Sequence, residues 1–205
     1  KNYLTLRASS QSAIRWRLAQ METHLVVAVI ALVVVGGATR VMEAGLACPD
    51  WPLCFGSFLP GRQMNLQVFL EWFHRLDAFV IGMTLLAQLL VSFLWRSRLP
   101  DWIPKASLFL VLLVSVQGGL GALTVINLVP SLVVTSHLAL GLVLIASLSA
   151  LSQRLLEPEE HLNPSPLWWR LMSGISALAV ILQSLVGGRM ATSWAVQRCL
   201  NNGQG

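Results

Sequence analysis

The sequence predicts an all-α, polytopic membrane protein: a four-helix transmembrane bundle, then a fifth helix that begins a second, incomplete four-helix repeat. Only 11% of the 205 residues are charged, whereas a soluble domain carries about 25%. Several uncharged runs approach the ~20 residues with which an α-helix crosses a bilayer. The first run ends with VGGATR at 35–40, and the fifth run ends with the similar stretch VGGRMAT at 186–192. Because an even number of spans separates these ends, we expect parallel repeats.

The basic residues predict the orientation of the chain. The net charge is +5, but the basic side chains lie beside the apolar runs and form no single patch, which argues against nucleic acid as a partner. Nine of the fourteen flank the same ends of the runs, namely Lys1, Arg7, Arg15, Arg17, Arg96, Arg98, Lys105, Arg154 and Arg170. Since positive charge gathers on the cytoplasmic side, we expect a multi-pass integral membrane protein with its N-terminus in the cytoplasm or its organellar equivalent. A bacterial plasma membrane, a thylakoid membrane and an organellar inner membrane all fit.

The four-helix unit is expected at residues 19–156, after a basic cytoplasmic tail at 1–18. Its first span is predicted at 19–38, where Glu22 and His24 lie at the cytoplasmic end and are expected to reach interfacial water. The next three spans are predicted at residues 67–94, 103–125 and 132–151.

The outer loop at residues 39–66 contains two cysteines. Cys48 and Cys54 are six residues apart on the predicted outer, oxidising side, so we expect a disulfide or redox pair that stiffens the loop over the mouth of the bundle. Two unlinked thiols and a metal site are the alternatives. A metal site lacks the further Cys or His ligands that common motifs place nearby.

The last part of the chain, residues 157–205, is expected to contain an inner loop, a fifth span and an outer tail. The fifth span is predicted at residues 167–186. We interpret His161, which lies among acidic residues and prolines in the inner loop, as a solvated residue.

Charge at the start of the second span is the main anomaly of the sequence. The stretch EWFHRLD at 71–77 opens an apolar run that continues to about residue 94. Charged groups at that depth cost ~2.5–3.5 kcal/mol each and persist mainly where they face a bundle interior and do chemistry.

Two histidines are predicted to lie at similar depth. Counted from the outer ends of their spans, His74 lies eight residues in and His137 six, roughly 12 and 9 Å. Both helices start on the outer side, so the two imidazoles can be ligands of one flat, iron-containing cofactor. Ala78 and Gly141 follow them by one turn and leave room for a macrocycle. The third span contributes QGGLG at 117–121, where a helix or a flat ring can approach the backbone.

The charged residues around His74 have two interpretations. Glu71 shares the face of His74 and can move protons or position water. Arg75 is expected to pair with Asp77 or with a propionate of the cofactor. In the alternative interpretation this is a polar helix end, in which the three charged residues are interfacial and the histidines make helix–helix hydrogen bonds.

Five stretches together resemble the haem A synthase family. They are GATR at 37–40, GLACPDWPLC at 45–54, EWFHR at 71–75, QGGLGALTV at 117–125 and VTSHL at 134–138. Their order and spacing make the resemblance specific, and it covers the N-terminal half of the family plus one helix.

The resemblance implies an eight-helix protein of two four-helix halves that oxidises one methyl group of haem O to a formyl group by successive hydroxylations. Haem O is then the substrate and haem A the product. The resemblance also implies that His74 and His137 bind the haem iron, that Glu71 takes part in the oxidation, and that Cys48 and Cys54 form a disulfide or redox pair.

The sequence departs from the family pattern after the fifth span. No histidine follows His161, so these residues do not form the second haem site of the family, and haem b is expected only if a second half exists. The chain is then either an incomplete view of a synthase or a shortened homologue. A shortened homologue is expected to be a non-catalytic, tetrapyrrole-binding subunit of a larger membrane complex, and a b-type electron carrier is a third option. The expected partners are membrane lipid, a haem-type tetrapyrrole, and haem O synthase or such a complex.

Overall fold

The computed structural model describes residues 2–156 and 165–192. Its long helices are α1 (Asn2–Val41), α2 (Leu66–Leu94), α3 (Trp102–Ile126), α4 (Ser131–Leu156) and α5 (Leu167–Thr192), with short 3₁₀ turns η1 (Gly61–Gln63) and η2 (Arg96–Arg98). All five long helices in this part of the chain are long and apolar enough to cross a membrane, which confirms the predicted all-α, polytopic class.

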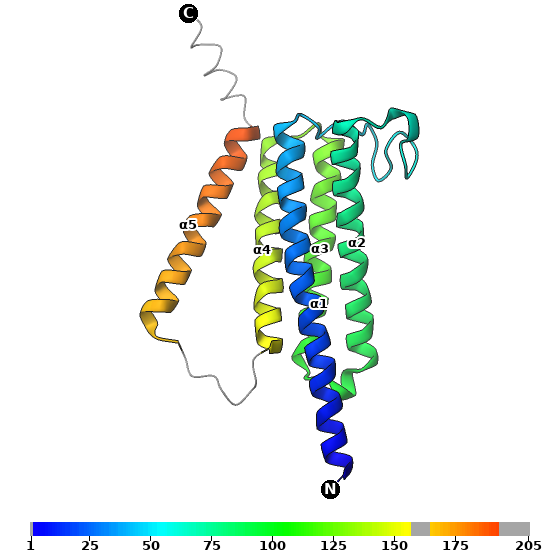
Figure 1. Ribbon diagram of the computed structural model, residues 1–205. Helices are drawn as coiled ribbons and strands as arrows, with labels where there is room; N and C mark the ends of the chain where they lie inside the picture. The colour runs from blue at the N-terminus through cyan, green and yellow to red at the C-terminus, as the bar shows by residue number, and fades with distance from the viewer. Residues whose placement is uncertain (1, 157–164, 193–205) are drawn as a thin grey trace, which may run out of the picture.

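Helices α1 to α4 form a closed four-helix bundle (Figure 1). α1 and α3 each pack against both α2 and α4, so α2 and α4 stand at opposite corners. α2 begins after Asn65, whose side-chain oxygen accepts a hydrogen bond from the Val68 N–H at 2.9 Å and so satisfies one of the free donors of the first turn. Pro104 lies in the first turn of α3, where a missing N–H disrupts no helical hydrogen bond.

α1 is longer than the predicted first span. It begins at Asn2, so the described part of the expected N-terminal tail continues the helix, and its candidate membrane span is Ala13–Val41. No glycine or proline lies between residues 2 and 18, so nothing in this polar stretch interrupts a helix. α2 and α3 begin and end within a residue of the predicted spans. α4 and α5 also begin within a residue of the prediction but continue past the predicted ends at 151 and 186, to Leu156 and Thr192.

The position of Glu22 differs from the prediction. Its side chain is wholly buried inside the bundle, so the expectation that it reaches interfacial water was wrong. The helix turns Glu22 toward Gln88 of α2, which donates a hydrogen bond to Glu22 Oε1. His24 is exposed, as predicted, and its Nδ1 lies 2.6 Å from the Gln20 carbonyl oxygen of its own helix.

The apolar core fills the inner part of the bundle, toward the N-terminus of α1. Its buried residues come from all four helices and from the turn before α3: Leu18, Ala19, Leu25, Val29, Ile81, Leu85, Leu99, Ile103, Leu110, Leu144, Leu148, Leu151 and Leu155. A second, small cluster of Cys48, Cys54 and Val68 lies under the outer loop. Between these clusters, among the described residues, no large apolar side chain is buried. The core is therefore interrupted at the level of His74 and His137.

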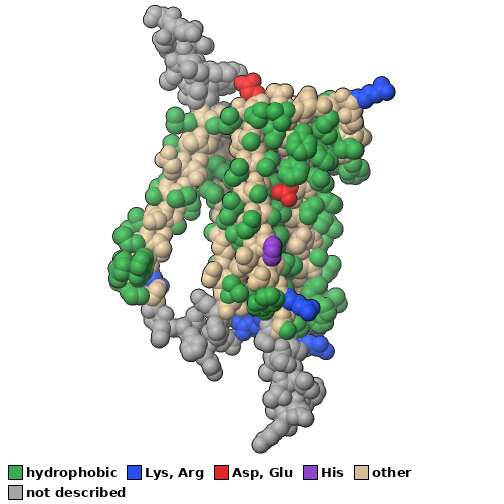
Figure 2. Space-filling view, viewed as in Figure 1, with side chains coloured by type: hydrophobic (Ala, Val, Ile, Leu, Met, Phe, Trp, Pro, Cys, Tyr) green, Lys and Arg blue, Asp and Glu red, His purple; other side chains and the backbone are tan. Residues whose placement is uncertain are grey.

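α5 stands apart from the bundle along most of its length (Figure 1). It meets the bundle near its C-terminal end, where Gly188 lies against Leu138 of α4 and Arg40 Nε of α1 donates to the Ala191 carbonyl at 3.2 Å. Nearly all its other described side chains are exposed, and Figure 2 shows a hollow between this helix and the bundle. The predicted inner loop around His161 and the tail at 193–205 lie outside the described residues.

Candidate functional site

His74 lies on α2 with its ring against α1. A Cβ atom placed on Gly36 would lie 2.9 Å from His74 Cε1, which is closer than packed side chains tolerate. The ring atom Nδ1 is buried and has no hydrogen-bond partner. The Leu32 backbone of α1 lies near this ring but makes no hydrogen bond with Nδ1. Since buried polar atoms without a partner are rare, Nδ1 has bonding capacity that the described residues do not use.

His137 lies on α4 with its ring against α3. A Cβ atom on Gly121 would lie 3.4 Å from His137 Cε1. His137 Nδ1 lies 3.1 Å from the Gln117 carbonyl oxygen, and Gln117 Nε2 donates to the His137 carbonyl at 2.9 Å. When Nδ1–H donates to that carbonyl, the lone pair remains on Nε2, which is the usual arrangement of a histidine that binds a metal.

The two histidines are the residues that could hold a flat metallocofactor between α2 and α4. They stand on opposite corners of the bundle, lie close enough to interact electrostatically, and occupy the level where the apolar core is interrupted. The room beside each ring comes from a glycine on the neighbouring helix. Gly141, which was predicted to leave room for the cofactor, instead faces the Gln117 side chain, since a Cβ atom there would lie 3.2 Å from Gln117 Nε2.

Both carboxylate oxygens of Glu71 are engaged. Oε2 accepts the Cys48 backbone N–H at 2.8 Å, and Oε1 accepts Arg75 Nη2 at 2.5 Å, an ion pair one turn apart on α2. The predicted pair between Arg75 and Asp77 was wrong, because residues two apart on a helix face different directions. Glu71 is thus fixed between the outer loop and the helix that carries His74.

Arg75 binds the backbone of the outer loop. Its Nη1 donates to the carbonyl oxygens of Asp50 and Leu53, each at 2.6 Å, and Nη2 approaches the Cys48 carbonyl at 3.5 Å. Cys48 and Cys54 are joined by a disulfide and both are buried. The guanidinium donors therefore face the loop, and a contact of Arg75 with a cofactor propionate stays a prediction.

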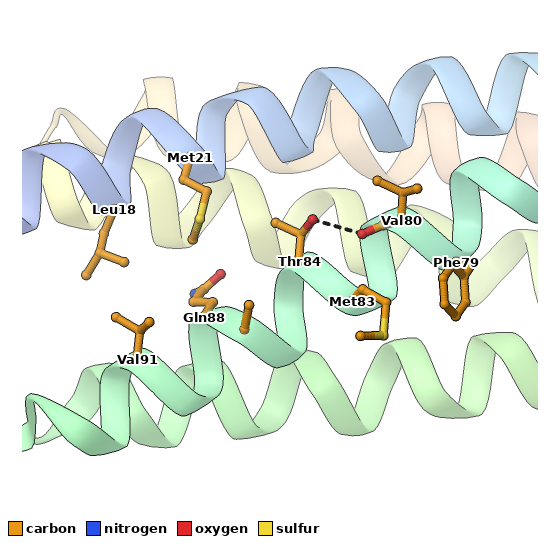
Figure 3. Close-up of a pocket in the computed structure, with 9 residues that line it drawn as sticks. Leu18, Met21, Phe79, Val80, Met83, Thr84, Gln88 and Val91 are labelled. Atoms are coloured by element: carbon orange, nitrogen blue, oxygen red, sulfur yellow. Dashed lines mark hydrogen bonds between the residues drawn. The ribbon is translucent and has the colours of Figure 1, made fainter.

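A groove of about 410 Å³ lies between α1 and α2, away from the histidines (Figure 3). It is lined by Leu18, Met21, Phe79, Val80, Met83, Thr84, Ala87, Gln88 and Val91. Only Thr84 and Gln88 are polar, and none of the predicted site residues lines it. The groove is therefore separate from the candidate site.

Comparison with known proteins identifies the family. Residues 20–204 match the family described as cytochrome oxidase assembly protein, COX15-CtaA. The chain belongs to this family. Its relatives include the haem A synthase of Shewanella oneidensis, 31% identical over 194 residues, 83% of this chain and 56% of the relative. The haem A synthase of Bradyrhizobium diazoefficiens is 30% identical over 223 residues, 91% of this chain and 60% of the relative.

A third relative has a different name. It is the protohaem IX farnesyltransferase of Haloarcula marismortui, 34% identical over 116 residues, 57% of this chain and 24% of the relative. No solved structure matches the chain.

Membership of this family places the chain among proteins of haem A biosynthesis. The chain spans between 48% and 61% of the length of five haem A synthases that it matches. The cross-helix partners of the histidines, Gly36, Gly121 and Gln117, lie in or beside the stretches GATR and QGGLG that carry the family resemblance. The sequence did not indicate that Gly36 would pack against the His74 ring, or that Gly121 and Gln117 would contact the His137 ring.

Proposed function

We propose that the chain binds haem O between His74 and His137 and oxidises one of its methyl groups to a formyl group. The observation that carries this proposal is the histidine pair at the interruption of the core, with Nδ1 of His137 held by a carbonyl and Nδ1 of His74 unpartnered. Two hydroxylations of the same carbon give a hydrate, which loses water to give the formyl group. Each hydroxylation removes two electrons from the carbon, which must pass to an external oxidant or electron acceptor, and the haem iron would mediate that transfer when bound.

The side chains of this chain are proposed to position the substrate and to move protons. Gln117 fixes the tautomer and the orientation of His137 through its carbonyl. Gly36 and Gly121 allow the imidazoles to lie close to the neighbouring backbones. Glu71, about one turn from His74, is proposed to accept a proton from the reacting group, and its ion pair with Arg75 supports this by fixing the carboxylate.

The orientation in the membrane is part of the proposal. The histidines, Glu71 and the disulfide loop lie at the end of the bundle away from Arg15 and Arg17. Since the positively charged end of a membrane protein faces the cytoplasm, the site is proposed to lie near the outer face, where a disulfide is stable.

Haem extraction tests the proposal. The full chain is produced in a membrane that contains haem O, and the bound haem is identified by mass spectrometry. We expect haem A and its hydroxylated precursor beside haem O. His74→Ala and His137→Ala should each remove the low-spin absorption, whereas His24→Ala, which changes an exposed histidine of α1, should leave it unchanged. Haem b alone, or an unchanged spectrum in both histidine variants, contradicts the proposal.

A second candidate function is tetrapyrrole binding without oxidation. It is favoured because both oxygens of Glu71 already have partners in the outer loop and on α2, as in a purely structural anchor. It is also favoured by the relative named protohaem IX farnesyltransferase, in which the matching segment is 24% of the protein. A binding unit of that kind would hold haem O beside a partner that supplies it.

Glu71→Gln separates the two candidates. The amide keeps an oxygen for the Cys48 N–H but loses the negative charge. If the chain is catalytic, formyl-haem production should fall by about 10²–10⁴-fold, the usual contribution of a general acid or base, while haem O stays bound. Bound haem O without any oxidised product in the unaltered chain supports the binding unit instead.

A further inference from the structure

A second set of polar side chains is buried at the inner end of the bundle. Glu22 of α1, Gln88 and Ser92 of α2, Ser107 of α3 and Ser152 of α4 are each at most 4% exposed. They lie among the residues of the apolar core and have no part in the histidine site. Polar groups within membrane-spanning helices are costly and are most often functional, so this layer requires an explanation of its own.

Two oxygen atoms in this layer lack a hydrogen-bond donor. Gln88 Nε2 donates to Glu22 Oε1 and approaches Ser107 Oγ at 3.3 Å. Glu22 Oε2 and Gln88 Oε1 are buried and have no partner. If the Gln88 amide were flipped, its oxygen rather than its nitrogen would face Glu22 Oε1. Two oxygens that face each other need a hydrogen between them. Either orientation of the amide therefore lacks one hydrogen.

In the part of the chain that the structure describes, no positively charged group is paired with Glu22 to balance a carboxylate. Its side-chain hydrogen bond is made with Gln88, a neutral residue. Gln88, which faces it from α2, and Ser107, which Gln88 approaches from α3, do not titrate. His24 on the same helix is turned outward to the Gln20 carbonyl. An isolated carboxylate in an apolar interior is strongly disfavoured and takes up a proton instead.

We infer that Glu22 is an intramembrane proton-binding site, a neutral carboxylic acid held by the Gln88 carboxamide. The ligand of this site is a proton, which supplies the hydrogen that the two unpartnered oxygens lack. Gln88 also lines the groove between α1 and α2 (Figure 3), while Glu22 is 0% exposed behind it. The carboxamide thus separates the acid from the membrane and closes the site on that side.

Infrared spectroscopy of the full chain in lipid nanodiscs at neutral pH tests this inference. We expect the C=O stretching band of a protonated carboxyl group in the unaltered protein and its loss in Glu22→Gln. Glu43→Gln, which changes an exposed carboxylate just beyond α1, should leave the band unchanged. Absence of the band from the unaltered protein would mean that a cation or water, rather than a proton, satisfies the oxygens. That result, or a band that persists in Glu22→Gln, overturns the inference.

A second variant tests the pairing without removing the acid. Gln88→Leu keeps Glu22 but removes its hydrogen-bond donor, so the carboxyl band should move to higher frequency, as expected for a carbonyl that loses a donor. An unchanged frequency overturns the pairing with Gln88. Because Glu22 lies far from His74 along the bundle, Glu22→Gln should keep the absorption spectrum of bound haem, which separates failure here from failure of the proposed haem function.

Discussion

At the scale of single residues, glycine shapes the candidate site as much as histidine does. Each imidazole lies against a glycine of the next helix, Gly36 for His74 and Gly121 for His137. A methyl group at Gly36 would overlap the His74 ring, with its Cβ 2.9 Å from Cε1, whereas one at Gly121 would touch the His137 ring at 3.4 Å. The position of the rings therefore depends on the absence of two side chains.

Gly36→Ala should displace His74. The new Cβ would lie 2.9 Å from Cε1 of that ring, and overpacking of this kind typically costs about 1–3 kcal/mol. We expect several-fold less haem after purification, measured by absorbance per protein. Gly37→Ala is the matched control, because a Cβ there meets nothing within 4 Å. Equal haem content in the two variants would show that the Gly36 contact has no part in haem binding.

Arg75→Lys should loosen the outer loop. A lysine cannot reproduce the planar set of donors that binds the Asp50 and Leu53 carbonyls and Glu71. We expect Cys48 and Cys54, which are now buried, to be reduced and alkylated several-fold faster under mild reductant, as measured by mass spectrometry. Arg62→Lys, on the exposed η1 turn, serves as control. Unchanged alkylation rates would mean that other contacts hold the loop.

From the sequence, the residues of the candidate site could be predicted more readily than the groups that each of them contacts. The depth of His74 and His137 followed from counting residues along two spans, and the cysteine pair followed from spacing and side. The hydrogen-bond partners of Arg75 and the burial of Glu22 could not be predicted, because both depend on how far each helix is rotated about its axis. That rotation is set by packing among four helices, and apolar positions all round a membrane helix leave it undetermined.

At the scale of helices, the spans were predictable because hydropathy and length determine them. The extension of α1 to Asn2 was not, since the polar stretch before the span shows neither a helix breaker nor an apolar face. α5 poses a different problem. Its composition predicts a membrane span. Among the described residues, only its C-terminal end contacts the bundle, and the sequence alone does not show how much of a span packs against its neighbours.

Gly188→Leu should move the outer end of α5 away from α4. A Cβ at this position would lie 2.8 Å from Leu138 Cδ2, and a leucine adds three further carbons. We expect a longer distance between spin labels placed on the outer ends of the two helices, measured by pulsed electron resonance. Gly187→Leu is the control, since a Cβ there has no neighbour within 4 Å. The same distance in both variants would place the contact between the helices elsewhere.

At the scale of the whole molecule, the bundle has two differently packed parts. The inner part holds the apolar core, whereas the part around His74 and His137 has no large buried apolar side chain among the described residues. Local stability follows buried apolar contact, so the outer part should open more often than the inner part. A ligand bound there would contribute the packing that the protein lacks.

Haem binding should therefore protect the two parts unequally. A ligand at about 100 times its dissociation constant stabilises the folded state by about 2.7 kcal/mol, and the gain should appear where the ligand makes contacts. We expect hydrogen–deuterium exchange, followed by mass spectrometry, to slow on haem loading near residues 32–41, 71–78, 117–122 and 134–141, with little change near residues 81–92 and 144–155. His137→Ala should abolish the difference, because one of the two proposed ligands is lost while the inner core is untouched. Uniform protection along the bundle would instead indicate that haem binds outside the histidine level and stabilises the bundle as one cooperative unit.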